Sequence, residues 1–278
     1  MKKSLFILLS VLLWTPAFSK LNIIVSIQPQ MEFVEKIGGE HINPTLMVVA
    51  GKSPHNYEPK PLQMIDISNA DLYLAIDVEF EKVWLPKFKS QNSKLQVVDI
   101  SKDVNKTSIK DDHANHEHLD PHIWIDPINV KIIAQNITNA LCSIDANNSH
   151  EYQKNLESYL HEIDILDSEI KKILEKTPKN SKFMVFHPSW GYFARRYGLE
   201  QIAIEVEGKS PKPKEIIKIL KEARKEKIKA IFTQPEFSDK SATIIANELK
   251  INVIKTSPLA ENWGQNLKNL AKAIANGE

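Results

Sequence analysis

NSHEYQKNLESYLHEIDILDSEIKKILEK, residues 148–176, is the stretch that decides the fold. Apolar residues recur at every third or fourth position along it, which is the spacing of a single helical face. Ser149 is suited to cap the start of this helix and Pro178 to end it. At 1.5 Å per residue the helix would be about 40 Å long. Its apolar face is expected to comprise Tyr152, Leu156, Tyr159, Ile163, Leu166, Ile170 and Ile173.

A helix of this length either packs along one large domain or bridges two lobes, and the residues around it favour a bridge. Strand-like and helix-like patterns alternate before it and again after it, which is typical of parallel α/β sheets. The expected strands are 21–27, 46–49, 72–76 and 95–98 before the helix, and 183–186, 202–205, 230–233 and 252–255 after it. The expected helices are 29–38, 61–69, 80–88 and 130–141 before it, and 214–225, 240–249 and 262–275 after it.

These elements predict an α/β protein of two Rossmann-like lobes with parallel sheets, joined by one long rigid backbone helix. We expect the N-terminal lobe over residues 20–147, the linking helix over 148–176 and the C-terminal lobe over 177–278. The length of 278 residues suits two lobes of this size. A rigid helical connection favours small closure motions over wide opening.

The N-terminus has the pattern of a secretory signal peptide. Two lysines follow Met1, residues 5–14 are apolar, and Ala17-Phe18-Ser19 is a small-x-small cleavage site. The apolar run is too short to span a bilayer, and no later run of 18 residues is apolar, so we expect no stable membrane insertion. Cleavage after residue 19 would send the mature chain to the periplasm.

Charge and cysteine content exclude several other classes of function. The net charge is +1, and removal of the signal leaves 34 basic and 35 acidic residues, so the composition gives no basis for nucleic-acid binding. Cys142 is the only cysteine, which excludes an intrachain disulfide. It lies far from the signal, so it cannot carry a lipid there, and we expect it to be buried.

Residues 111–127, DDHANHEHLDPHIWIDP, are the part of the chain richest in side chains that bind metal. We interpret this stretch as a loose metal-attracting segment followed by one fixed ligand, His122. The segment, residues 111–118, would use His113, His116 and His118 to capture metal weakly or to sense its abundance. The same composition would also suit an ordinary solvated loop.

Three histidines share a local signature, because each is next to a proline: His55, His122 and His187. Proline stiffens the chain around it, as a site with fixed imidazoles requires. His55 and His187 also follow expected strands, and ligands of open α/β sheets bind beyond the carboxyl ends of strands. A single histidine beside a proline is more often structural, but the three together, with the export signal and the histidine-rich segment, predict that separate segments bring three imidazoles to one crevice.

Five motifs resemble those of the metal-binding solute-binding proteins of ABC importers, the cluster A-I or cluster 9 family. Together they span essentially the whole mature chain. The resemblance implies two α/β lobes joined by one long helix, a divalent metal held between them, delivery to an inner-membrane permease, a monomeric state and no catalysis. The motifs are SPHNYEP (53–59), DPHIWIDP (120–127), FHPSWGYFARRYGL (186–199), EGKSPKP (207–213) and TQPEFSDKSA (233–242).

Matched position by position, the resemblance implies that His55, His122 and His187 are the ligands of a transported Zn²⁺. Many family members have an aspartate as the fourth ligand, where this chain has Ser257. The fourth ligand would then be water or a nearby carboxylate, and the candidate carboxylates are Glu58, Glu79 and Glu207. Family members with a histidine- and acid-rich loop before the second ligand histidine are usually zinc importers, and residues 111–118 of this chain have that composition.

Two alternative functions stay open at this point. Manganese- or iron-binding members of the same family have a glutamate as the third ligand, whereas this chain has His187, and three imidazoles suit zinc. A zinc hydrolase would also use three histidines and an open fourth position, but the sequence has no H-E-x-x-H helix. Asp120 and Asp126 could orient the histidines or could be turn residues. The pair Arg195-Arg196 is expected on a solvated helix face, with permease contact as the alternative.

Overall fold

The computed structural model describes residues 20–108, 119–205 and 209–277. The expected signal peptide, the histidines of the 111–118 segment and Glu207 lie outside the described residues. Among the described helices, each is either too short or too polar to cross a membrane.

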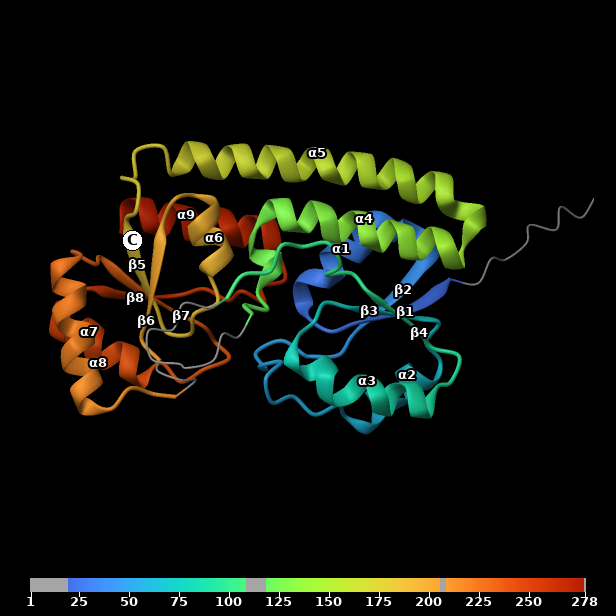
Figure 1. The fold of residues 1–278 in the computed structure, drawn as a ribbon, viewed down its shortest axis with the longest axis horizontal. Helices are drawn as coiled ribbons and strands as arrows, with labels where there is room; N and C mark the ends of the chain where they lie inside the picture. Colours follow the sequence, from blue (N-terminus) through green and yellow to red (C-terminus); the bar gives the residue numbers. More distant parts are fainter. Residues whose placement is uncertain (1–19, 109–118, 206–208, 278) are drawn as a thin grey trace, which may run out of the picture.

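The first sheet has four parallel strands in the order β2-β1-β3-β4. Helices α1 and α4 cover one face of this sheet, and α2 and α3 cover the other (Figure 1). The strands are β1 (Leu21–Val25), β2 (Ile42–Leu46), β3 (Leu72–Ala75) and β4 (Gln96–Asp99). The helices are α1 (Gln28–Gly38), α2 (Pro61–Ser68), α3 (Glu79–Gln91) and α4 (Pro127–Ile144), with short 3₁₀ turns η1 (Gly39–His41), η2 (Ile123–Ile125) and η3 (Ala146–Asn148).

The second sheet repeats this arrangement, with four parallel strands in the order β6-β5-β7-β8. Helices α6 and α9 lie on one face and α7 and α8 on the other (Figure 1). The strands are β5 (Lys182–Val185), β6 (Glu200–Ala203), β7 (Ala230–Thr233) and β8 (Asn252–Lys255). The helices are α6 (Gly191–Arg196), α7 (Pro213–Lys225), α8 (Lys240–Leu249) and α9 (Trp263–Asn276). The expected α/β fold with two parallel sheets is confirmed.

Helix α5 (Ser149–Ile173) is the long linking helix, and it runs past both sheets (Figure 1). It packs against α1 and α4 on the side of the first sheet and against α9 on the side of the second. The buried residues of α5 are those of the predicted apolar face, except that Ile173 is not among them and Asp167 is. Ser149 is the first residue of the helix rather than its cap, because the 3₁₀ turn η3 leads directly into α5.

One hydrophobic core runs from the first sheet through α5 to α6 and α9, so the two halves share it. Trp263 of α9 packs edge-on against Phe33 of α1, with ring centroids 5.2 Å apart. The indole of Trp263 donates to the carbonyl of Trp124 at 2.8 Å, and the indole of Trp124 donates to the carbonyl of Pro258 at 2.8 Å. A second, smaller core lies between the second sheet and α7 and α8.

Three further local predictions were wrong. Strand β2 begins at Ile42 rather than residue 46, because an edge strand tolerates Pro44. Cys142 is half-buried rather than buried, with its sulfur 3.8 Å from the carbonyl oxygen of Ser149. Arg196 is half-buried because it binds Asp167 of α5 at 2.7 Å, whereas Arg195 is exposed.

Candidate metal centre

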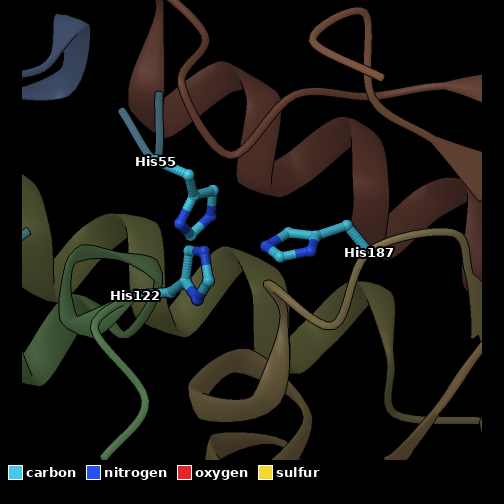
Figure 2. Close-up of side chains that lie close together, drawn as sticks. All are labelled: His55, His122 and His187. Carbon is cyan, nitrogen blue, oxygen red and sulfur yellow. The ribbon is translucent and has the colours of Figure 1, made fainter. Parts of the chain in front are cut away.

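The structure brings His55, His122 and His187 together from three separate segments. His55 lies in the loop between β2 and α2, His122 directly precedes η2, and His187 is two residues beyond β5. Figure 2 shows the three rings pointing toward one another. The ring centroids are 5.2 Å apart for His55 and His187, 5.3 Å for His122 and His187, and 6.5 Å for His55 and His122. One ring nitrogen from each lies within 4.8 Å of the others.

A carboxylate lies behind each imidazole, on the Nδ1 side. Asp120 Oδ1 is 2.7 Å from His122 Nδ1, and Glu205 Oε1 is 2.7 Å from His187 Nδ1. Glu79 Oε2 lies 3.2 Å from His55 Nδ1, within ion-pair range but outside hydrogen-bond geometry. Carboxylates in this position fix the tautomer with the proton on Nδ1 and raise the basicity of the other nitrogen. Each Nε2 is therefore left to face the centre of the site.

His187 is the clearest case of a nitrogen without a protein partner. Its side chain is 11% exposed, and its Nε2 is buried with no hydrogen-bond partner. Burial lowers the pKa of His187, against the opposing effect of Glu205, so the ring is neutral at pH 7. Phe237 stacks on the ring at a centroid distance of 4.7 Å. A buried lone pair in this state is suited to bind a cation.

His122 is held by a tight turn through Asp120 and Pro121. Asp120 Oδ1 accepts from both the backbone N–H of His122 at 3.0 Å and the ring at 2.7 Å. The hydroxyl of Tyr192, in α6, donates to the carbonyl oxygen of Asp120 at 3.0 Å. A Cβ at Gly191 would lie 2.9 Å from Asp120 Oδ2, so glycine is needed for this close approach. The first turn of α6 thus braces the loop that carries His122.

His55 is the outermost of the three, with 33% of its side chain exposed. Contact with Glu79 raises the pKa of His55, and burial only partly opposes this effect. Burial would raise the pKa of Glu79, but His55 outweighs it and the pKa is about 2. In the metal-free protein His55 therefore keeps its proton to a higher pH than a free histidine does.

The three glutamates expected as candidates for the fourth ligand differ in their position relative to the cavity between the histidines. Glu58 is exposed and does not line the cavity between the histidines. Glu79 lines it but faces His55, and Glu207 is not described. Asp126 does not orient a histidine, since it caps α4 by accepting from the N–H of Ile128 at 2.8 Å.

Sequence reasoning missed one carboxylate in this cavity, that of Glu236. It lines the cavity beside Phe237 and Pro258, and its Oε2 is buried without a hydrogen-bond partner. Burial raises the pKa of Glu236, against the opposing hydrogen bond from Ser257. Its position three residues beyond β7, like that of His187 just beyond β5, was the signal available in the sequence.

The donor set fits a tetrahedral zinc ion after a small contraction. Zinc binds imidazole nitrogens at about 2.0–2.1 Å, which places two ligand nitrogens roughly 3.3–3.4 Å apart. The nitrogens now lie within 4.8 Å of one another, so closing on an ion requires shifts of roughly 1 Å.

A family described as "Zinc-uptake complex component A periplasmic" matches residues 23–277. The chain belongs to this family. Among solved structures similar to this ZnuA-family chain, a crystal structure of ZnuA is 39% identical, with a TM-score of 0.87 over 93% of this chain and 99% of that one. A zinc-bound deletion mutant of ZnuA is likewise 39% identical, with a TM-score of 0.87 over 93% and 98% of the two chains.

A sequence relative of this ZnuA-family chain is the high-affinity zinc uptake system protein ZnuA of Bacillus subtilis (strain 168). The two are 27% identical over 252 residues, which is 85% of this chain and 78% of the relative. The family resemblance expected from the motifs is thus confirmed. Members of the ZnuA family are components of metal uptake rather than enzymes, so the hydrolase alternative is set aside.

Proposed function

We propose that this chain captures Zn²⁺ through the Nε2 atoms of His55, His122 and His187 and delivers it to the inner-membrane permease of an ABC uptake system. The observation that carries the proposal is the convergence of three imidazoles, each with a carboxylate behind it, in one cavity. Zinc is the cargo here and not a resident cofactor. The zinc named for the relatives supports the same assignment.

The ligand chemistry favours zinc over manganese or iron. Three imidazoles form a nitrogen-rich, borderline-soft site, whereas Mn²⁺ prefers carboxylates and other oxygen donors. His187 adds a buried neutral imidazole rather than a carboxylate. Competition between Zn²⁺ and Mn²⁺ for the metal-free protein tests this selectivity, and tighter binding of Mn²⁺ would favour the manganese alternative.

Delivery requires the site to open, and the ligands are arranged for this. His55 and His122 belong to the lobe of the first sheet, and His187 belongs to the lobe of the second. We take residues 20–147 and 177–278 as the two moving units and 148–176 as the helix between them. Because the core is continuous across α5, a small rotation rather than wide opening would withdraw His187 and release the ion.

Export and accessory metal capture would depend on residues 1–19 and 111–118, which lie outside the described residues. Residues 1–19 would direct the chain to the periplasm, where we expect a monomer. His113, His116 and His118 would form an accessory loop that binds metal more weakly than the three fixed histidines. Removal of residues 111–118 should therefore leave one tight zinc site.

Zinc titration of the metal-free protein, with a chelator as competitor, tests the proposal. One tight site is expected, and His122→Ala should abolish tight binding. His161→Ala is a matched control, because His161 is exposed on α5, away from the cavity. Unchanged affinity in His122→Ala would refute the assignment, as would an equal loss in His161→Ala.

A further inference from the structure

The loop after β7 is fixed against the segment that carries His187. Gln234 donates from Nε2 to the carbonyl oxygen of His187 at 2.9 Å and to Ser189 Oγ at 3.0 Å, and its Oε1 accepts from the N–H of His187 at 3.3 Å. Three residues later, Phe237 stacks on the ring of His187. Glu236 lies between these two anchors, so its backbone has a fixed position beside a candidate zinc ligand.

The carboxylate of Glu236 is held at one oxygen and free at the other. Ser257 donates from Oγ to Glu236 Oε1, and the N–H of Leu259 donates to Ser257 Oγ at 3.0 Å, which orients the hydroxyl. Glu236 Oε2 is buried and has no hydrogen-bond partner. A buried carboxylate oxygen without a partner is costly unless a cation or donor occupies the adjacent space.

Among the described residues that line this cavity, buried side-chain atoms without a hydrogen bond occur at three places: Glu79 Oε2, His187 Nε2 and Glu236 Oε2. Glu79 Oε2 is engaged with His55 at 3.2 Å. Among these three buried atoms, His187 Nε2 and Glu236 Oε2 are therefore the two that have neither a hydrogen bond nor an ion-pair partner.

We propose that Glu236 is the fourth zinc ligand, with Oε2 as the bonding atom and Ser257 as the residue that positions it. The inference rests on the proposed function, in which His55, His122 and His187 bind zinc. A carboxylate oxygen binds zinc at about 2.0–2.2 Å and would complete a tetrahedral N₃O set. The cluster of ligand atoms within 4.8 Å of one another holds the three histidines and not Glu236, so the Glu236 side chain has to move toward the ion as the site contracts. The carboxylate also reduces the net charge of the bound ion in a buried site, which three neutral imidazoles cannot do.

The test compares Glu236→Gln with Glu79→Gln, the same substitution at a residue that acts through His55. Zinc affinity is measured by chelator competition, and the coordination of the ion by X-ray absorption at the zinc edge. Loss of a positioning carboxylate lowers metal affinity by about 10–100-fold. We expect Glu236→Gln to lose about 100-fold or more, and only this variant to lose the carboxylate oxygen from the zinc shell.

Each outcome separates this inference from the proposed function. Wild-type affinity and an unchanged shell in Glu236→Gln would overturn the role of Glu236 and leave the three-histidine site standing. A wild-type protein that binds no zinc would overturn both. Ser257→Ala keeps the carboxylate, so it should weaken binding less than Glu236→Gln while the N₃O shell persists. A zinc shell with three nitrogens and water in the wild type would also refute Glu236 as a ligand.

Discussion

Replacement of Asp120 by alanine isolates the contribution of the carboxylate behind His122. The side chain is 4% exposed and holds both the backbone N–H and the ring of His122. Asp120→Ala leaves the imidazole in place but frees its rotation and its tautomer. Loss of a carboxylate that orients a metal ligand costs about 10–100-fold in metal affinity, which corresponds to about 1.4–2.7 kcal/mol.

Asp126→Ala is the matched control, since both aspartates precede a proline in the same DPHIWIDP motif. Asp126 caps α4 and touches no candidate ligand, so its loss should cost about 1 kcal/mol of stability and leave zinc affinity unchanged. The assay is chelator competition on metal-free protein, with urea unfolding to measure stability separately. Equal zinc affinities in the two variants would refute the orienting role of Asp120.

Three further predictions concern stability, pH and packing. Asp167→Ala should lower the free energy of unfolding by about 2–4 kcal/mol in a urea titration, because it removes the carboxylate that pairs with half-buried Arg196 at 2.7 Å and leaves only Asp126 Oδ1, at 3.9 Å. A loss no greater than the ~0–1 kcal/mol expected for Asp164→Ala, whose ion pair is exposed, would contradict this. Zinc affinity should fall as pH decreases through the raised pKa of His55, since zinc must displace that proton; affinity that is flat with pH between about 5.5 and 8 would count against a histidine site. Gly191→Ala should weaken zinc binding, because the added Cβ would push Asp120 away from His122. Wild-type zinc affinity in this variant would show instead that the loop carrying Asp120 and His122 shifts without harm to the site.

The sequence predicted the regular parts of this fold well, because its patterns there are strong and local. Strands 230–233 and 252–255 and the helix 240–249 have the predicted bounds. The two parallel sheets also follow from the alternation of strand-like and helix-like segments. The long helix follows from its apolar face, whose residues recur at every third or fourth position. The prediction placed strand β2 too late in the sequence. Pro44 and its polar neighbours give this edge strand no hydrophobic pattern by which it could be recognised.

The three histidines could be singled out from sequence because each lies beside a proline, and Asp120 could be named as an orienting carboxylate because it is two residues from His122. The roles of Glu79 and Glu205 behind the other two histidines could not be predicted. Glu79 is 24 residues from His55 and Glu205 is 18 residues from His187, and only the sheet topology brings each pair together. Glu236 lies in the TQPEFSDKSA motif, three residues beyond β7, but neither feature marks it as a metal ligand. A loop carboxylate is normally solvated, so the burial of Glu236 Oε2 and the hydrogen bond from Ser257 to Oε1 become evident only from the structure.

The shared core limits how the site can work. Trp124 and Trp263 exchange indole hydrogen bonds with backbone carbonyls close to the cavity, and α5 packs against helices of both halves. Domains joined by a large apolar interface move little relative to one another. Release of zinc should therefore involve a displacement of about an ångström or two at the ligands, which is enough to break a metal–nitrogen bond of about 2.0 Å.

A crystal structure of the zinc-loaded protein, with anomalous scattering measured at the zinc edge, tests the proposed site most directly. We expect one anomalous peak bonded to the Nε2 atoms of His55, His122 and His187 at about 2.0–2.1 Å, with Glu236 Oε2 as the fourth atom. A zinc ion that lacks any of the three histidines would contradict the proposed function, whereas three histidines and water would refute only the role of Glu236.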